Sequence, residues 1–220
     1  TCPTYVTLGD ELDSPRGRIY LIKDMLESGA PVSNKVVKHV DRCLSCLSCM
    51  TTCPASVDYM HLVDLTRARI TKTYKRSFSD QLMRKTLELV LPYPNRFRIA
   101  LLGVWFAKPF AKVLPSILGS MLKLAPTKIS SPSPIDRPQT IKAEKSKIKR
   151  IALLTGCAQQ VLNPLINEAT VRLLTRHGCE VVIADGMGCC GALVHHMGLE
   201  DEAHIQAKNN RPITREVIPV

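Results

Sequence analysis

Apolar residues recur with the spacing of amphipathic helices through the first part of the chain. This spacing predicts a helix over residues 18–26, with Gly29 just beyond it as a stop, and another over residues 57–75. Asp80 is expected to cap a further helix over residues 81–91. No alternation typical of strands competes with these patterns, so we expect this part to be mostly α-helical.

The apolar stretch over residues 97–124 is broken by prolines and predicts short buried helices. Pro92 and Pro94 precede it and are expected to end the helix before it. Lysines and prolines within the stretch would be costly at the centre of a bilayer. We therefore predict no transmembrane helix.

The pattern changes after residue 150. Residues 151–154 and 181–184 are short continuous apolar runs, which are typical of strands buried on both faces of a parallel sheet. Between them, Asn163 is expected to cap a helix that begins at Pro164 and ends near Arg176. This order predicts a β-α-β unit that opens an α/β domain.

Residues 126–149 are rich in proline, serine and lysine and lack apolar periodicity, which is typical of a linker. The predicted fold class is therefore α plus α/β. An α-helical domain with a helical extension is expected over residues 1–125. After the linker, residues 150–220 are expected to form the start of a parallel-sheet α/β domain.

The composition is that of an ordinary globular chain, with 45% hydrophobic and 22% charged residues, except for nine cysteines. An odd number of cysteines in 220 residues fits a disulfide scaffold poorly and favours metal or redox chemistry in a reducing compartment. The net charge is +11, and residues 1–150 hold 25 Lys and Arg against 12 Asp and Glu. This surplus suits nucleic acid, anionic lipid, an acidic protein or a solvated face, and does not choose among them.

Four cysteines follow the spacing C-x2-C-x2-C-x3-C-P, which is the ferredoxin pattern: Cys43, Cys46, Cys49 and Cys53. Three thiolates two residues apart can hold three corners of one [4Fe-4S] cube, while the fourth points to a neighbouring cube. Zinc sites generally use C-x2-C pairs with longer spacers, so this dense run fits zinc poorly.

Cys2-Pro3 reads as the end of an earlier run of the same kind. In two-cluster ferredoxins the fourth cysteine of each run serves the other cluster. The expected ligands of one complete [4Fe-4S] centre are therefore Cys2, Cys43, Cys46 and Cys49. Cys53 is left as the ligand of a second cluster whose other ligands are missing.

Three further cysteines follow the two predicted strands: Cys157 after the first, and Cys189 and Cys190 after the second. Open α/β sheets bind ligands at the carboxyl ends of their strands, so these thiols are expected to converge into a cofactor site. The alternative is that they are packing residues. Cys179 begins a strand and is expected to be core.

Two other groups have no role that the sequence alone assigns. His195 and His196 are adjacent, and such pairs are more often surface or core residues than ligands. Arg16 and Arg18 follow Asp13-Ser-Pro, which indicates either cations near the cluster or a capped helix start. No catalytic acid or base stands out.

Together, Cys2-Pro-Thr-Tyr, Asp13-Ser-Pro-Arg-Gly-Arg, the run from Cys43 to Pro54, Thr155-Gly-Cys and Cys189-Cys-Gly resemble the glycolate oxidase iron-sulfur subunit. The resemblance implies a ferredoxin-like domain with two [4Fe-4S] clusters, followed by a cysteine-rich domain with CCG motifs. It also implies a subunit of an oxidoreductase whose flavin is carried by partner flavoproteins, and which passes electrons toward a membrane or quinone acceptor. Such a subunit is expected in the cytoplasm or peripherally on the cytoplasmic face of the inner membrane.

Two departures from the family pattern follow from the same motifs. The first three cluster cysteines of the family would precede Thr1, and its second CCG motif would follow Val220. The pattern after residue 210 also predicts no continuation of a helix. We therefore expect the chain to be a fragment or a truncated form.

Several related functions share these cysteine patterns. They include iron-sulfur subunits of lactate-utilisation systems, of anaerobic glycerol-3-phosphate dehydrogenase and of heterodisulfide reductase relatives, since the flavoprotein partner chooses the substrate. The chain lacks a G-x-G-x-x-G fingerprint, which places the flavin on a partner. A nucleic-acid-binding metal module is the alternative from another class, but no nucleic acid is expected because the binding motifs and interleaved aromatics are missing.

Overall fold

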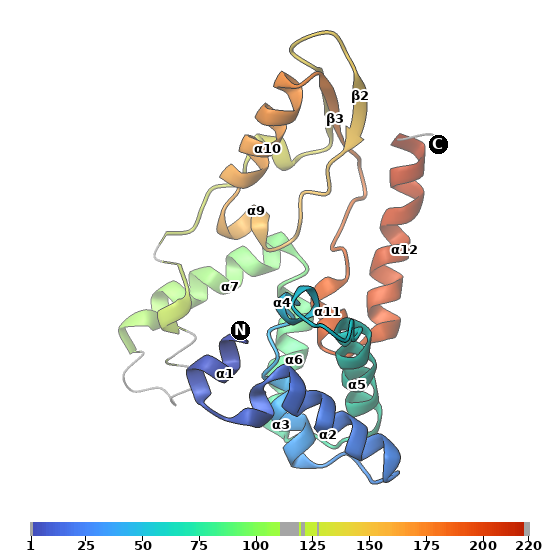
Figure 1. Ribbon diagram of the computed structural model, residues 1–220. Coiled ribbons are helices and arrows are strands. Elements are labelled where there is room, and N and C mark those ends of the chain that lie inside the picture. The colour runs from blue at the N-terminus through green and yellow to red at the C-terminus, as the bar shows by residue number, and fades with distance from the viewer. Residues whose placement is uncertain (1, 111–118, 120–121, 127, 218–220) are drawn as a thin grey trace. The chain divides into compact units, whose positions relative to one another are not determined.

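The computed structural model describes residues 2–110, 119, 122–126 and 128–217 (Figure 1). The chain forms two compact units, which are described separately. Thr1–Arg84 and Ala192–Ala203 form the first, and Lys85–Gly191 and His204–Val220 form the second. The mixture of helices and strands expected from the sequence is confirmed, whereas the domain boundaries proposed above remain a prediction.

The first unit consists of helices. They are α1 (Pro3–Leu8), α2 (Pro15–Glu27), α3 (Asn34–Asp41), α4 (Ser48–Thr51), α5 (Tyr59–Thr73), most of α6 (Phe78–Val90), α11 (Ala192–His196) and the start of α12 (Glu200–Val217), with the 3-10 helix η1 (Glu11–Asp13). The helices predicted over 18–26 and 57–75 correspond to α2 and α5.

The core of this unit lies where α2, α3 and α5 meet. Each helix contributes apolar residues three or four positions apart, so that one stripe is buried. The fully buried members include Ile22, Val40, Val63 and Ile70, each 0% exposed. Gly17 brings η1 against α2, because a Cβ at this position would lie 2.2 Å from the Glu11 carbonyl oxygen.

The second unit contains a three-stranded sheet in the order β1-β3-β2. Its strands are β1 (Gln139–Ile141), β2 (Lys149–Ala152) and β3 (Cys179–Ile183). Its helices are the rest of α6, α7 (Pro94–Ala107), α9 (Gln159–Leu162), α10 (Leu165–Arg176) and the rest of α12, with the 3-10 helices η2 (Lys108–Phe110) and η3 (Pro134–Asp136). In Figure 1, α10 lies beside the strands β2 and β3 that it connects.

The predicted β-α-β unit is present. β2 pairs in parallel with β3, with Ile151 opposite Val181. Gly178, at φ 77°, ends the turn from α10 into β3. The sheet is mixed rather than wholly parallel, because β1 pairs antiparallel with the other side of β3. β1 and η3 lie within the stretch that was read as a linker.

Two local expectations for this unit were wrong. The first strand is not buried on both faces: β2 is an edge strand, and its Lys149 and Arg150 are exposed. Asn163 does not cap α10, because it ends α9 and α10 begins only after Pro164 without a side-chain cap.

Three helix boundaries also differ from the expectations. Asp80 lies in the first turn of α6 and its amide donates to the Ser77 hydroxyl at 3.3 Å, so Ser77 takes the capping role. Pro94 begins α7, where a proline is tolerated because the first turn has no hydrogen bond to lose. The helix α12 continues to Val217, beyond the point where the pattern was expected to stop.

The helices expected to be buried over residues 97–124 are only partly as predicted. α7 is present, but several of its apolar side chains are exposed, including Ile99 and Phe106. Residues 111–118 and 120–121 of this stretch lie outside the described part of the chain. Among the described residues, no helix is both long and apolar enough to cross a membrane.

Candidate functional site

A tight loop between α3 and α4 carries Cys43 and Cys46, and α4 itself carries Cys49. The loop turns at Ser45 and Leu47, which have φ values of 51° and 56°, an unusual conformation for residues other than glycine. This path leads Cys43, Cys46 and Cys49 to the wall of one small hollow.

Cys2, the residue that precedes α1, lines the same hollow. Its sulfur lies 3.1 Å from the Thr4 hydroxyl and 3.5 Å from the Asp13 carbonyl oxygen. Cys53 is not among the residues that line the hollow. The structure therefore brings together the four cysteines assigned to one centre and leaves aside the one assigned to another.

Arg18 is a buried cation beside these thiols, 1% exposed. Its Nε donates to the His39 carbonyl oxygen at 2.6 Å, and its Nη2 donates to the Thr4 hydroxyl at 2.9 Å. Its Nη1 lies 3.6 Å from the Cys2 sulfur. The guanidinium is thus held by two neutral acceptors and by the Asp13 carboxylate, 3.5 Å from Nη2, and its Nη1 faces the Cys2 sulfur. Ser14 caps α2 by accepting from the Gly17 amide at 3.0 Å, so the capped helix start is confirmed. Of the two arginines in the Asp-Ser-Pro-Arg-Gly-Arg segment, Arg18 lines the hollow and Arg16 is exposed.

The neighbours of the thiols affect how readily they ionise. The pKa of Cys2 is lowered: burial opposes ionisation, but hydrogen bonds from Thr4 and Arg18 outweigh it. The Ser48 amide lowers the pKa of Cys46. Burial raises the pKa of Cys49, and the neighbouring thiols add to the rise. As free thiolates, the four cysteines of the hollow (Cys2, Cys43, Cys46 and Cys49) would repel one another. A cation bound among them offsets this repulsion.

A second polar group meets the loop from α5. The Tyr59 hydroxyl donates to the Cys43 sulfur at 3.4 Å. Arg67 donates to the Cys43 carbonyl oxygen at 2.6 Å and to the Ser45 hydroxyl at 2.5 Å. These contacts fix the loop on α5 and supply one hydrogen bond to a ligand sulfur.

The donor set fits an iron-sulfur cluster. Four thiols converge on one hollow, and thiolate is the ligand that [4Fe-4S] clusters use. Hydrogen bonds from Arg18 and Tyr59 to sulfur are the kind of contact by which proteins tune such clusters. The residues that would hold the cluster are therefore Cys2, Cys43, Cys46 and Cys49.

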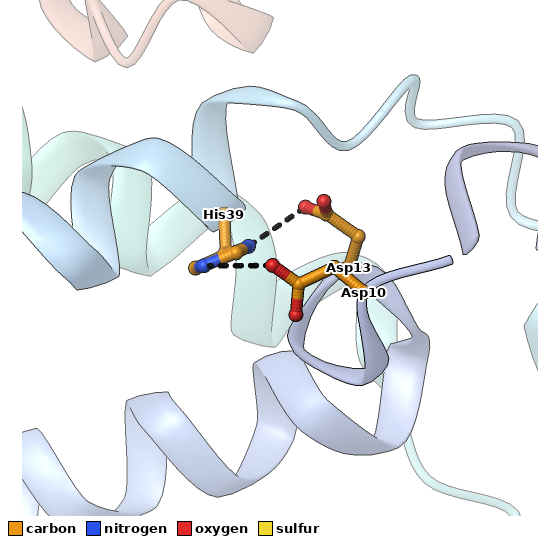
Figure 2. A group of neighbouring side chains, drawn as sticks. All are labelled: Asp10, Asp13 and His39. Carbon is orange, nitrogen blue, oxygen red and sulfur yellow. Dashed lines mark hydrogen bonds and ion pairs between the residues drawn. The ribbon is translucent and has the colours of Figure 1, made fainter. Parts of the chain in front are cut away.

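A different group of potential metal ligands lies close by in the same unit. Figure 2 shows the ring of His39 between the carboxylates of Asp10 and Asp13. His39 Nδ1 lies 2.8 Å from one Asp13 oxygen, and Arg42 donates to the other at 2.8 Å. Because the His39 ring contacts one Asp13 oxygen and the Arg42 guanidinium donates to the other, we interpret this group as a structural polar network that also contacts Arg18.

The cysteines of the second unit also meet. Cys157 follows β2, Cys189 follows β3, and their sulfur atoms lie 3.5 Å apart. Cys189 is buried, and Cys190 beside it is exposed. Burial raises the pKa of Cys189 to about 11, with further contributions from Cys157 and Cys190. The predicted convergence at the carboxyl ends of the parallel strands is confirmed for the Cys157–Cys189 pair.

Two buried asparagines hold the loops that carry these cysteines. Asn167, on α10, donates to the Thr155 carbonyl oxygen at 2.9 Å. Asn210, on α12, accepts from the Gly188 amide at 3.0 Å and donates to the Cys189 carbonyl oxygen at 2.9 Å. Cys179 begins β3 as expected and pairs with Lys149 in the strand register, but it is half-buried and not part of the core.

The two histidines without an assigned role contact Asp64 of α5. His195 Nε2 lies 3.2 Å from one carboxylate oxygen, and His196 Nδ1 lies 3.7 Å from the other. Arg67 Nη1 lies 3.9 Å from Asp64 as well. They therefore help to fasten α11 to α5 within the first unit.

Sequence reasoning missed Tyr59, Asn167 and Asn210 as supports of the two cysteine groups. Each is separated from the cysteine that it serves by at least one secondary-structure element, so no spacing reveals it. Tyr59 and Asn167 lie in helices with apolar stripes, whereas Asn210 lies in the mostly polar α12, so no common signal in the sequence marks the three.

Comparisons with known proteins agree with the cysteine patterns. Residues 151–217 match the model of the family described as the cysteine-rich domain, CCG. The matched residues include Cys157, Cys189 and Cys190, the three cysteines that follow the parallel strands.

Two relatives match nearly the whole chain. The chain is 41% identical over 210 residues to the glycolate oxidase iron-sulfur subunit of Escherichia coli (strain K12), which covers 96% of this chain and 48% of that protein. It is 32% identical over 223 residues to the probable glycolate oxidase iron-sulfur subunit of Bacillus subtilis (strain 168), with 96% and 50% covered. The resemblance stated from the motifs is thereby confirmed.

A shorter match is to lactate utilization protein A of Exiguobacterium sp. (strain ATCC BAA-1283 / AT1b), 36% identical over 59 residues, which covers 27% of this chain and 24% of that protein. No solved structure matches significantly. The chain spans about half the length of the two glycolate oxidase relatives.

Proposed function

We propose that this chain is an iron-sulfur electron-transfer subunit of a flavin-dependent dehydrogenase that oxidises a 2-hydroxy acid, glycolate. The observation that carries the proposal is the convergence of Cys2, Cys43, Cys46 and Cys49 on one hollow. Similarity to two glycolate oxidase iron-sulfur subunits over 96% of the chain supports the substrate class.

When bound, a [4Fe-4S] cluster supplies one-electron transfer. The chain's own residues prepare the site for it. Arg18 presents a buried positive charge to Cys2, which favours an added negative charge nearby. Tyr59 donates to the Cys43 sulfur and occupies one side of the hollow, which limits access of water. Neither group has to move a proton for this role.

Further cofactor sites are proposed at Cys53 and in the second unit. Cys53 would serve a second [4Fe-4S] cluster, because it does not line the first hollow. Cys157, Cys189 and Cys190 would form a further cofactor-binding site, which the 3.5 Å contact between two of the sulfurs supports. The flavin would be carried by partner flavoprotein subunits, and electrons would leave toward a membrane or quinone acceptor from the cytoplasmic side.

A related redox system is the second candidate. The match to lactate utilization protein A favours it, although that match covers only 27% of this chain. The two candidates differ in the flavoprotein partner. Combining the chain with the partner's flavoprotein subunits and testing whether glycolate or lactate reduces the clusters distinguishes them.

The test of the iron-sulfur role is anaerobic reconstitution with iron and sulfide, followed by metal analysis and low-temperature paramagnetic resonance. We expect equal amounts of iron and sulfide and the signal of one reduced [4Fe-4S] centre, which Cys46→Ala removes. Cys179→Ala is the matched control and should keep the signal. Bound zinc without sulfide, or a full signal in Cys46→Ala, would contradict the proposal.

A further inference from the structure

The helix α7 has apolar side chains on two faces. One stripe, which includes Phe97, Leu101 and Val104, lines an apolar cavity of the second unit. The other stripe is exposed to solvent: Ile99 is 69% exposed, Leu102 50%, Trp105 53% and Phe106 68%. A helix that is apolar all round is normally covered on every side, so the outer stripe indicates a binding surface.

The cavity behind α7 is large and lined by carbon-rich side chains. Leu87 and Val90 of α6, Leu122 and Leu162 contribute to its wall together with the inner stripe of α7. A cavity of this kind suits a hydrocarbon chain better than a polar substrate, because its lining offers few hydrogen-bond partners. The cavity and the exposed stripe are therefore two apolar features on opposite faces of the same helix.

The charged residues that flank α7 in the sequence are all basic. Residues 89–135 contain no Asp or Glu, and they contain six basic residues, namely Arg96, Arg98, Lys108, Lys112, Lys123 and Lys128. Of these, Arg96, Lys123 and Lys128 are exposed. Arg98 interacts with Asp136, so the exposed Arg96, Lys123 and Lys128 carry the argument. An exposed apolar stripe that basic residues flank in the chain is complementary to an apolar surface that carries anions.

We infer that the outer stripe of α7 (Ile99, Leu102, Trp105 and Phe106) lies in the headgroup region of an anionic lipid bilayer. At 1.5 Å per residue, 14 residues span about 21 Å, less than the roughly 30 Å of a hydrocarbon core, so the helix lies along the surface. Tryptophan favours the boundary between lipid and water, and Lys and Arg favour anionic headgroups. An acidic protein partner would satisfy the charges but would give no reason for a hydrocarbon-lined cavity.

The inference rests on the proposed function in one respect: a membrane or quinone acceptor for the electrons gives a reason for the contact between α7 and lipid. Lipid binding by α7 uses no cysteine of either candidate site. A measurement of lipid binding and a measurement of iron on the same sample can therefore fail independently.

Trp105 is the only tryptophan of the chain, so its fluorescence reports directly on α7. The test mixes the reconstituted chain with vesicles of phosphatidylcholine alone or with added phosphatidylglycerol. We expect sedimentation with the anionic vesicles, a blue shift of the Trp105 emission, and quenching by lipids brominated in their acyl chains. High salt should weaken the binding, because it screens the cations.

Matched double variants separate the surface from a general effect. Leu102→Ser with Phe106→Ser should weaken vesicle binding at least tenfold, whereas the control Leu26→Ser with Leu173→Ser should leave it unchanged. The control residues are also exposed, at 50% and 59%, and lie on other helices. Circular dichroism verifies that each variant is folded.

A second pair tests the charges. Lys123→Glu with Lys128→Glu should weaken binding to anionic vesicles at least tenfold, whereas Lys142→Glu with Lys145→Glu, on another exposed segment, should have little effect. The inference is overturned if anionic vesicles leave the Trp105 emission unchanged, or if both pairs weaken binding equally. It is also overturned if only added flavoprotein subunits shift the emission, since the surface is then an interface between subunits. If the sample takes up no iron on reconstitution and still binds the vesicles, the proposed function is contradicted and this inference stands.

Discussion

The guanidinium of Arg18 lies 3.6 Å from the sulfur of Cys2, and both are held by Thr4, whose hydroxyl contacts each of them. The arginine belongs to α2 and the cysteine precedes α1, so the contact ties two separate segments to the wall of the hollow. A fixed positive charge at a ligand sulfur stabilises the more negative state of whatever the thiolates bind.

Arg18→Met is therefore expected to lower the reduction potential of the cluster, on the order of 100 mV for a lost charge at this distance. A redox titration followed by paramagnetic resonance measures the shift. Arg16→Met, an exposed position of the same helix, should leave the potential nearly unchanged. An unaltered potential in Arg18→Met would show that the arginine only supports the fold.

The position of Cys53 outside the hollow leads to a prediction about crossed ligation. Cys53→Ala should keep the first centre, whereas Cys2→Ala should lose it or convert it to a cluster with fewer irons. Iron content and the resonance signal of the reduced protein measure both outcomes. The reverse result would mean that all four ligands come from the run between Cys43 and Cys53.

The contact between Cys157 and Cys189 makes them expected partners in oxidation. In the metal-free chain, an added thiol oxidant such as diamide should accept two hydrogens from this pair. The two sulfur atoms, which are 3.5 Å apart, would then form a disulfide bond. Peptide mapping by mass spectrometry identifies the bond, and Cys157→Ser should abolish it. A crosslink from Cys157 to Cys190 instead would show that the exposed thiol is the nearer one in solution.

Gly17 is expected to be a sensitive position for stability. A Cβ there would lie 2.2 Å from a backbone oxygen and 2.6 Å from Leu12 Cα, so Gly17→Ala forces η1 away from α2. We expect a loss of about 1–3 kcal/mol in the free energy of unfolding, measured by urea denaturation. Gly103→Ala is the matched control: its Cβ meets nothing within 4 Å, and the change should stabilise α7 by about 0.5–1 kcal/mol.

The sequence predicted the cysteine groups better than their surroundings. The spacing between Cys43 and Cys53 is a local property, and the meeting of Cys157 and Cys189 follows from the rule that parallel neighbours end at one edge. Arg18 and Tyr59 approach the thiols only because α2 and α5 pack on α3, and that packing is set by the whole core. No local pattern contains it.

The elements that the sequence did not predict share a physical cause. α3 has eight residues, and β1 has three, so neither offers enough positions for a period to be recognised. Both are stabilised by partners far along the chain: β1 by its antiparallel pairing with Val181 and Val182, and α3 by the core with α2 and α5. Asp80 failed as a cap because Ser77, three residues earlier, competes for the same role.

The docking of α11 on α5 affects the order in which the molecule can be completed. Gly198 lies so close to α5 that a Cβ would come within 2.4 Å of the Arg67 carbonyl oxygen, and Val194 is fully buried. These residues belong to the first unit but leave the ribosome only after the whole sheet of the second unit has been made. The first unit therefore cannot finish folding during synthesis of its own amino-terminal part. In a shortened gene product that stops before residue 192, the surface of α5 that α11 covers would be exposed, and chaperones or proteases could bind there.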